Sequence, residues 1–264
     1  MQSLSKTHPI WLCDIWGVVH DGHHAIESAV AALTKHRSLG GRVVLITNAP
    51  RPKFNIVVQL EDIGVSDSAY DDIVSSGDVT RSWMENYGQV FHVGPPSDGS
   101  LFEGAQARRV TLAEAKAVIC TGYLEDRSQD NEAYRADFEQ MRERKLPMIC
   151  ANPDKVVRIG KQLYLCAGTL AEYYSGMGGE VIMAGKPFAP IYDLALQKAG
   201  HPPRDKVMVI GDGPETDVRG AELQGLACYF VSGGINTAAD PEAEVRAKFP
   251  QVKIVASSPE LVWR

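Results

Sequence analysis

The sequence predicts an α/β protein whose core is a doubly wound, Rossmann-like parallel sheet with a second α/β unit inserted in it. First, short apolar segments alternate with helical segments between Pro9 and Ser76, which is typical of a doubly wound sheet. Second, this alternation gives way to a different rhythm and then returns at Val181. Third, polar residues follow several of the apolar segments, where ligands bind in parallel sheets.

The composition fits a globular protein and excludes several classes of partner. The 264 residues carry a formal net charge of −6, and 44% of them are hydrophobic, which is enough for a sizeable core. A dedicated nucleic-acid binder would be strongly basic, so we expect no nucleic-acid partner. We expect no membrane span, because no apolar stretch is long enough. An anionic substrate stays compatible with this charge, since one Lys and one metal ion outweigh the net charge locally.

The cysteines and the N-terminal segment predict a cytoplasmic protein. The five cysteines are an odd number, and no two of them form a C-x-x-C pair. This pattern fits reduced core thiols better than a disulfide framework. Asp14 interrupts the early apolar segment, so we expect no signal peptide. The cysteines are Cys13, Cys120, Cys150, Cys166 and Cys228.

The N-terminal part supplies three strands and two helices of the predicted core. Its first apolar segment is apolar at consecutive positions, as in a strand buried on both faces, and it ends at Asp14. Gly40 and Gly41 end the first helix. The expected elements are a strand at 9–13, a helix at 25–39, a strand at 42–46, a helix at 53–63 and a strand at 72–76.

Residues 79–180 are predicted to form the inserted unit, so that residues 1–78 and 181–264 form the core. A loop rich in Gly and Pro is expected from Gly94 to Gly104. A hairpin is expected around Gly160 and Lys161, with strands at 155–159 and 162–166. The other expected elements are a helix at 78–87, strands at 90–93 and 117–121, a helix at 131–145 and a strand at 147–151.

The C-terminal part returns to the first rhythm. Its clearest segment is the apolar run from Val207 to Ile210, which predicts a buried strand. The expected elements are a strand at 181–184, a helix to 199, a strand at 206–210, a helix to 223, strands at 227–231 and 252–256, and a last short helix.

Polar residues follow four predicted core strands. They are Asp14, Thr47 with Asn48, Lys186, and Asp212 with Asp217. Each motif alone is also explained by a turn, a solvated loop or a helix cap. Because strands of one direction end at the same edge of a parallel sheet, we expect the four groups to converge there.

The order and spacing of these motifs resemble the haloacid dehalogenase-like hydrolase superfamily, in its class IIA (NagD-like) branch. The resemblance covers nearly the whole chain, and the fourth motif is the most specific. The matching segments are Asp14–Val18, Thr47–Asn48, Gly185–Pro187 and Gly211–Asp217, together with Ala151–Asp154 in the cap that this branch inserts between its second and third motifs.

The resemblance implies a Mg²⁺-dependent phosphatase of small phosphorylated metabolites, often a homodimer that pairs through the cap. It implies that Asp14 is the nucleophile and that Lys186 neutralises the transferring phosphoryl group. It places Mg²⁺ on the carboxylates of Asp14 and Asp212 and the carbonyl of Trp16, with Asp217 in support. Phosphate oxygens would be held by Thr47 and the backbone near Asn48. Asn152 and Asp154 are candidate substrate contacts in the cap, and a plain Asx-Pro turn explains them equally well.

One position departs from the family pattern. The family phosphatases usually carry a second Asp two residues after the first, and this chain has Trp16 there. That Asp normally protonates the leaving group and then activates water. His20 and Asp21 are the nearest replacements, although a solvated loop is the favoured interpretation of His20, His23 and His24.

Two function hypotheses therefore stay open. The first is a phosphatase with an altered acid/base step, and the second is a catalytically weak or inactive phosphate-binding protein of the same fold. A receiver-like signalling domain also uses an Asp, a Thr and a Lys at strand ends. The inserted unit and the late acidic motif argue against that third hypothesis.

Overall fold

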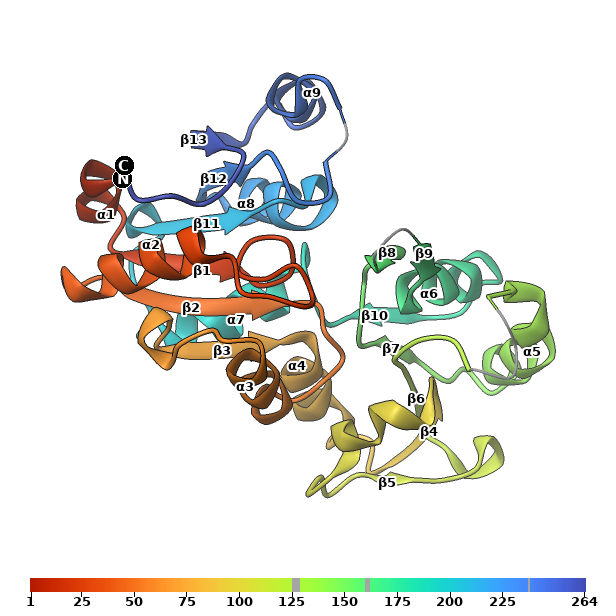
Figure 1. Ribbon diagram of the computed structural model, residues 1–264. Coiled ribbons are helices and arrows are strands. Elements are labelled where there is room, and N and C mark those ends of the chain that lie inside the picture. The colour runs from red at the N-terminus through yellow and green to blue at the C-terminus, as the bar shows by residue number, and fades with distance from the viewer. Residues whose placement is uncertain (125–128, 160–161, 237) are drawn as a thin grey trace. The chain divides into compact units, whose positions relative to one another are not determined.

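A computed structural model describes residues 1–124, 129–159, 162–236 and 238–264, and it divides into two compact units (Figure 1). The core unit comprises Met1–Thr47, Ile56–Val74 and Lys186–Arg264. The insertion unit comprises Asn48–Asn55 and Ser75–Gly185. The chain therefore passes from one unit to the other after Thr47, Asn55, Val74 and Gly185.

The core unit is built on a six-stranded sheet with the order β13-β12-β11-β1-β2-β3. β1 is central and pairs in parallel with both β2 and β11, and β12 continues the parallel pairing from β11 to β13. The strands are β1 (Ile10–Asp14), β2 (Arg42–Thr47), β3 (Asp72–Ser75), β11 (Val207–Gly211), β12 (Ala227–Val231) and β13 (Lys253–Ser258).

Helices cover both faces of this sheet, with α2 and α7 on opposite faces (Figure 1). Burial from both sides explains why Trp11, Leu12 and Cys13 of β1 are all fully buried. The helices are α1 (Gln2–Thr7), α2 (Glu27–Ser38), α3 (Lys53–Asp62), α7 (Ala189–Lys198), α8 (Arg219–Gln224) and α9 (Pro241–Lys248), with short turns at η1 (Asp67–Ala69), η6 (Arg204–Lys206) and η7 (Pro214–Val218).

The insertion unit has its own five-stranded parallel sheet, with the order β10-β7-β6-β4-β5. A two-stranded antiparallel sheet joins β8 to β9, as the hairpin prediction expected, and the turn predicted at 160–161 lies outside the described residues. The strands are β4 (Gln89–Val93), β5 (Arg108–Arg109), β6 (Ala117–Cys120), β7 (Met148–Cys150), β8 (Val156–Ile159), β9 (Gln162–Leu165) and β10 (Val181–Met183).

Helices and helical turns complete the insertion unit. α4 begins with a capping box, in which Ser75 and Asp78 exchange hydrogen bonds with each other's backbone. The helical elements are α4 (Ser76–Met84), α5 (Arg135–Glu143) and α6 (Ala167–Gly176), with turns η2 (Pro96–Phe102), η3 (Leu112–Glu114) and η5 (Asn131–Tyr134).

The structure corrects two expectations about the C-terminal part. The strand at 181–183 was expected in the core, but β10 pairs with β7 in the insertion sheet, because a three-residue apolar run fits the edge of either sheet. The boundaries of the units are accordingly Gly185/Lys186 rather than 180/181, and Val74/Ser75 rather than 78/79. The last short helix is also wrong, because β13 extends to Ser258 and the six residues after it are not helical.

No helix among the described residues combines the length and the apolar character that crossing a membrane requires.

Candidate active site

Asp14 occupies the end of the central strand β1 and is almost fully buried. The ammonium group of Lys186 donates hydrogen bonds to Asp14 Oδ1 at 2.5 Å and to Asp217 Oδ1 at 2.8 Å. Lys186 is itself only 3% exposed, so one buried cation joins two buried carboxylates. The predicted convergence of these three side chains in the core unit is what the structure shows.

The fourth motif supplies Asp217 and also brings a third carboxylate, Asp212, to the same place. Asp212 directly follows β11, and its Oδ2 accepts a hydrogen bond from the backbone N–H of Ile235 at 2.9 Å. Asp217 lies in the η7 turn, where its Oδ2 accepts from the N–H of Gly213 at 3.1 Å. Asp14, Asp212 and Asp217 each offer an oxygen within 4.8 Å of the other two, so the three form a cluster that suits a metal ion.

Two glycines make room for Asp212. Gly17, at φ +83°, and Gly234, at φ +61°, both adopt left-handed backbone conformations, which glycine tolerates best. A Cβ at either position would lie under 3.0 Å from Asp212 Oδ2. The loop after β1 and the loop after β12 therefore both depend on glycine to approach this carboxylate.

The sequence prediction missed the loop after β12. Asn236 donates from Nδ2 to the backbone carbonyl of Asp212 at 2.9 Å, and to the carbonyl of Gly233 at 2.9 Å. Together with the N–H of Ile235, Asn236 fixes the backbone and the side chain of Asp212. The available signal was the Ser-Gly-Gly run that directly follows the predicted strand at 227–231.

The electrostatics of the cluster indicate an excess of negative charge. Burial raises the pKa of Asp14, and Asp217 raises it further against the opposing effect of Lys186. Burial and Asp217 raise the pKa of Asp212 to about 7. Burial lowers the pKa of Lys186, but the carboxylates of Asp14 and Asp217 outweigh that effect and raise it. Three carboxylates face one ammonium group, so an all-oxygen donor set with surplus negative charge fits a hard divalent cation such as Mg²⁺.

Trp16 presents its indole ring to the loop that follows it. A Cβ at Gly22, which has φ +99°, would lie 2.6 Å from Trp16 Cη2. The ring also packs edge-on against His20, with 5.2 Å between ring centroids. The large side chain at this position is therefore accommodated by a left-handed glycine and a buried imidazole.

The two nearest candidates for a replacement acid or base are both engaged within their own loop. His20 Nδ1 accepts a hydrogen bond from the N–H of Gly22 at 2.9 Å, and burial lowers the pKa of His20. Its neutral ring therefore carries the proton on Nε2. The carboxylate of Asp21 accepts from the N–H groups of His23 and His24 at 2.8 and 2.7 Å.

The remaining predicted residues lie at the end of β2 or in the segments that follow β2 and β7. Thr47 ends β2 in the core unit and is buried. In the insertion unit, Asn48 donates from Nδ2 to Asp154 Oδ1 at 2.8 Å. The N–H of Asp154 in turn donates to Asn152 Oδ1 at 3.1 Å, which is the Asx turn that the sequence also allowed. The insertion unit thus brings Asn48, Asn152 and Asp154 together.

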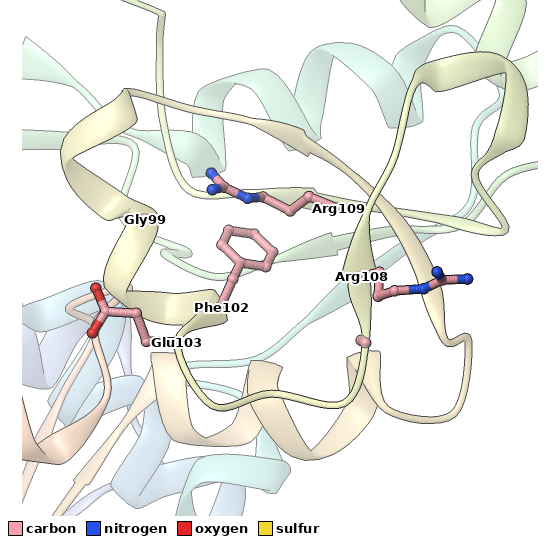
Figure 2. A pocket seen from close by; sticks show the side chains of 6 residues that line it. Gly99, Phe102, Glu103, Arg108 and Arg109 are labelled. Atoms are coloured by element: carbon pink, nitrogen blue, oxygen red, sulfur yellow. The ribbon is translucent and has the colours of Figure 1, made fainter.

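The insertion unit also has a surface hollow of about 360 Å³ that contains none of the predicted site residues. In Figure 2 the guanidinium of Arg109 lies over the ring of Phe102, and the distance to the ring centroid is 5.0 Å. The hollow is lined by Gly99, Phe102, Glu103, Ala107, Arg108 and Arg109.

Comparisons with known proteins show which family the chain resembles. Residues 11–108 match the family described as haloacid dehalogenase-like hydrolase, and residues 183–258 match the family described as HAD-hydrolase-like. D-glycerol 3-phosphate phosphatase from Mycobacterium tuberculosis is 23% identical over 292 residues, which span 100% of this chain and 77% of that protein. The crystal structure of a glycerol phosphate phosphatase from the same species in complex with magnesium has a TM-score of 0.77 at 22% identity, covering 98% of this chain and 77% of that one.

A more similar solved structure covers almost the entire chain. It is a hydrolase of the haloacid dehalogenase-like family from Brucella suis 1330, with 38% identity and a TM-score of 0.87. The alignment includes 99% of this chain and 98% of that one. The predicted fold class and the predicted family resemblance are both confirmed, and this chain belongs to the haloacid dehalogenase-like hydrolases.

Proposed function

We propose that the protein is a Mg²⁺-dependent phosphatase that hydrolyses a small phosphorylated metabolite through an aspartyl-phosphate at Asp14. The observation that carries the proposal is the buried contact of Lys186 with Asp14 and Asp217, next to Asp212. A nucleophilic carboxylate, a neutralising ammonium group and an oxygen-rich metal site are the parts that phosphoryl transfer to an Asp requires. The relatives named glycerol phosphate phosphatase support a small phosphorylated substrate.

The proposed reaction has two steps. In the first, a carboxylate oxygen of Asp14 bonds to phosphorus, and the bond from phosphorus to the leaving oxygen breaks, with its electron pair going to that oxygen. In the second, a water oxygen bonds to phosphorus, the bond to Asp14 breaks, and inorganic phosphate departs while a water proton passes to solvent. Throughout, Lys186 holds Asp14 in place and offsets the charge on the transferring group.

Mg²⁺, when bound by Asp14, Asp212 and the main-chain carbonyl of Trp16 with Asp217 in support, would supply positive charge for the phosphoryl oxygens. Thr47 and the backbone near Asn48 are the proposed holders of those oxygens.

We also propose that the protein works in the cytoplasm, with no nucleic-acid or membrane partner, and forms a homodimer.

The second candidate function is a catalytically weak or inactive phosphate-ligand-binding protein. Trp16 favours it, because an indole supplies no proton at neutral pH to a leaving group. His20 and the carboxylate of Asp21 are both engaged by backbone groups of their own loop. The two candidates share the metal and phosphate site and differ in turnover.

A phosphate-release screen with purified protein separates them. Phosphate esters are incubated with graded additions of Mg²⁺, and in parallel with EDTA, which removes the ion. The phosphatase proposal expects release that requires Mg²⁺ and is lost in Asp14→Asn. Binding of inorganic phosphate without any Mg²⁺-dependent release would favour the second function, and release unaffected by EDTA would contradict the first.

A further inference from the structure

A compact cluster of five insertion-unit residues lies where the chain enters and leaves that unit. We call Asn48, Ser76, Pro153, Asp154 and Gly185 the crossing cluster. Asn48 is the first residue after one crossing, Ser76 is the second residue after another, and Gly185 is the last before a third. Three crossing points that are far apart in the sequence therefore lie next to the turn that contains Pro153 and Asp154.

The hydrogen bond between Asn48 and Asp154 is the polar link of the cluster. Its donor and acceptor are 106 positions apart, and the N–O distance is 2.8 Å. Asp154 is itself well fixed, because its N–H donates to Asn152 Oδ1 and its carbonyl accepts from the N–H of Gly168 at 3.1 Å. Asn48 is only 5% exposed and Asp154 is half-buried, so the amide of Asn48 is oriented by an acceptor that is partly shielded from solvent.

Gly185 is the steric link. A Cβ there would lie under 3.0 Å from Asn48 Oδ1, Pro153 Cδ and Ser76 Oγ. No left-handed φ is involved at this position, so glycine is required by space and not by backbone conformation. An alanine would consequently disturb the packing of the cluster without straining the chain itself.

Further contacts join the segment after Asn48 to the start of α4. The N–H of Gly77 donates to the carbonyl of Ala49 at 3.2 Å. Ser75 Oγ donates to the carbonyl of Arg51 at 2.6 Å, and the N–H of Lys53 donates to Asp78 Oδ1 at 3.0 Å. Hydrogen bonds therefore join the crossing segments into one block.

Two residues proposed to take part in phosphoryl transfer are bonded directly to residues of this cluster. Thr47 precedes Asn48, and Lys186, which holds Asp14, follows Gly185. We propose that Asn48 and Asp154 are positioning residues that set Thr47 and Lys186 for phosphoryl transfer, and that neither side chain binds the substrate. This inference rests on the proposed phosphatase function. Misplacing a reacting group by about 1 Å is enough to cost about 10²-fold in rate.

A donor–acceptor exchange tests the role of the pair. Asn48→Asp faces one carboxylate with another, so we expect kcat to fall by about 10²-fold with little change in KM. Asp154→Asn keeps an amide oxygen that still accepts, so we expect a smaller loss. The double variant N48D/D154N restores the same bond in the reverse direction, and we expect kcat within about threefold of the wild type.

The exchange distinguishes positioning from direct contact. If Asn48 bound the phosphate with its side chain, the carboxylate in N48D would repel phosphate in the double variant as well, and activity would stay low. A double variant that is folded but as slow as N48D would therefore overturn the proposal, and so would a fully active N48D. If N48D fails to fold, recovery of folding in the double variant supports the pairing, and failure of both refutes it.

Gly185→Ala tests the packing of the crossing cluster independently of the hydrogen bond, and Gly176→Ala is its matched control. Gly176 is a glycine of the same unit, at the end of α6, where an added Cβ would have nothing within 4 Å. We expect Gly185→Ala to lower kcat about tenfold or more and Gly176→Ala to leave it unchanged. Equal effects of the two substitutions would contradict a role for the cluster.

Stability measurements separate this inference from the proposed function. Denaturant unfolding of the wild type, both single variants and the double variant gives the coupling between positions 48 and 154 without any assay of activity. If the wild type proves inactive toward all phosphate esters, the proposed function fails. Coupling in this cycle would then still establish the pair, whereas its absence would refute the inference itself.

Discussion

The ammonium group of Lys186 lies 2.5 Å from the carboxylate of Asp14, although the two residues are 172 positions apart in the chain. Asp14 is the last residue of the central strand of the core sheet. Lys186 is the first core-unit residue after the insertion segment Ser75–Gly185. The contact is buried on both sides, so solvent does not screen it. It therefore makes both the chemistry and the stability of the core depend on the chain returning correctly from the insertion.

Asp14→Asn should abolish phosphate release and leave the fold intact. An amide is a poor nucleophile at phosphorus and a weaker ligand for a hard metal ion. It still accepts a hydrogen bond from Lys186, so the packing around β1 is kept. Phosphate release and far-UV circular dichroism check both expectations, and unchanged turnover would remove Asp14 from the role of nucleophile.

Lys186→Met should be both inactive and destabilised. It leaves three buried carboxylates without their ammonium partner, and breaking a buried pair costs about 3–5 kcal/mol. Mg²⁺ should recover part of that loss, because a bound cation offsets the same charge and stabilises the folded state. Denaturant unfolding with Mg²⁺ and with EDTA measures the difference.

Lys155→Met is the matched control for that substitution. Lys155 also pairs with a carboxylate, Glu172, at 2.8 Å, but both side chains are 64% exposed. An exposed pair contributes about 0–1 kcal/mol, so this variant should unfold nearly like the wild type. Equal destabilisation of the two variants would mean that the buried carboxylates do not depend on the charge of Lys186 for their stability.

His36 should make the stability of the protein fall in mild acid. Its ring stacks on Trp11 at 3.7 Å, Nε2 donates to the carbonyl of Pro9, and Nδ1 accepts from Ser5 Oγ at 2.7 Å. These contacts suit one neutral tautomer, and burial lowers the pKa of His36 to about 4.

The sign of the effect follows from which state binds the proton first. The unfolded chain protonates near the usual pKa of about 6.5, so the contribution of His36 is complete above that pH and is lost as the pH falls toward 4. The loss amounts to about 3 kcal/mol. Burial also lowers the pKa of His92 to about 4, so both histidines act in the same direction.

Unfolding free energies between pH 7 and pH 4 test this expectation. His36→Gln should reduce the slope of stability against pH by up to one proton, about 1.4 kcal/mol per pH unit. His92→Gln should do the same independently. A slope that neither substitution changes would show that other groups control stability in this window.

The core and the carboxylates of its site were predictable because Asp14 and Asp212 lie at the ends of the buried strands β1 and β11. Asp14 and Asp212 needed only the rule that strands of one direction end at one edge of a parallel sheet. Lys186 follows β10, which lies in the insertion sheet, so that rule does not account for its place beside Asp14. The partner of β10 was not predictable, because three apolar residues carry no information on which sheet they join. The local sequence pattern therefore predicted the positions of the site carboxylates better than the boundary of the insertion unit.

Contacts between distant polar residues carried no local signal. Asn48 and Asp154 are separated by 106 positions, and each is explained in isolation by a cap or an Asx turn. The support of Asp212 by Ile235 and Asn236 was missed for the same reason, although the Gly-Gly run after β12 marked the loop. Only the fold shows that these residues meet.

Trp16 should make the quality of the leaving group decide the rate. General acid catalysis typically contributes about 10²–10⁴-fold, and no carboxylate is available at position 16 to supply it. An alkyl phosphate must then expel a strongly basic alkoxide, whereas an aryl or acyl phosphate releases a weaker base. We expect p-nitrophenyl phosphate and acetyl phosphate to be hydrolysed far faster than sugar phosphates, and the aspartyl-phosphate to accumulate.

Trp16→Asp should restore activity on alkyl phosphates, because it returns a carboxylate to the position where the family pattern has one. Trp16→Phe is the control, since it also opens space beside His20 and Gly22 but supplies no proton. Steady-state rates across a series of leaving groups compare the three proteins. A steep dependence in the wild type and in Trp16→Phe, flattened in Trp16→Asp, is the expected result. A flat dependence in the wild type with no gain in Trp16→Asp would mean that Trp16 only packs against its loop and that another group moves the proton.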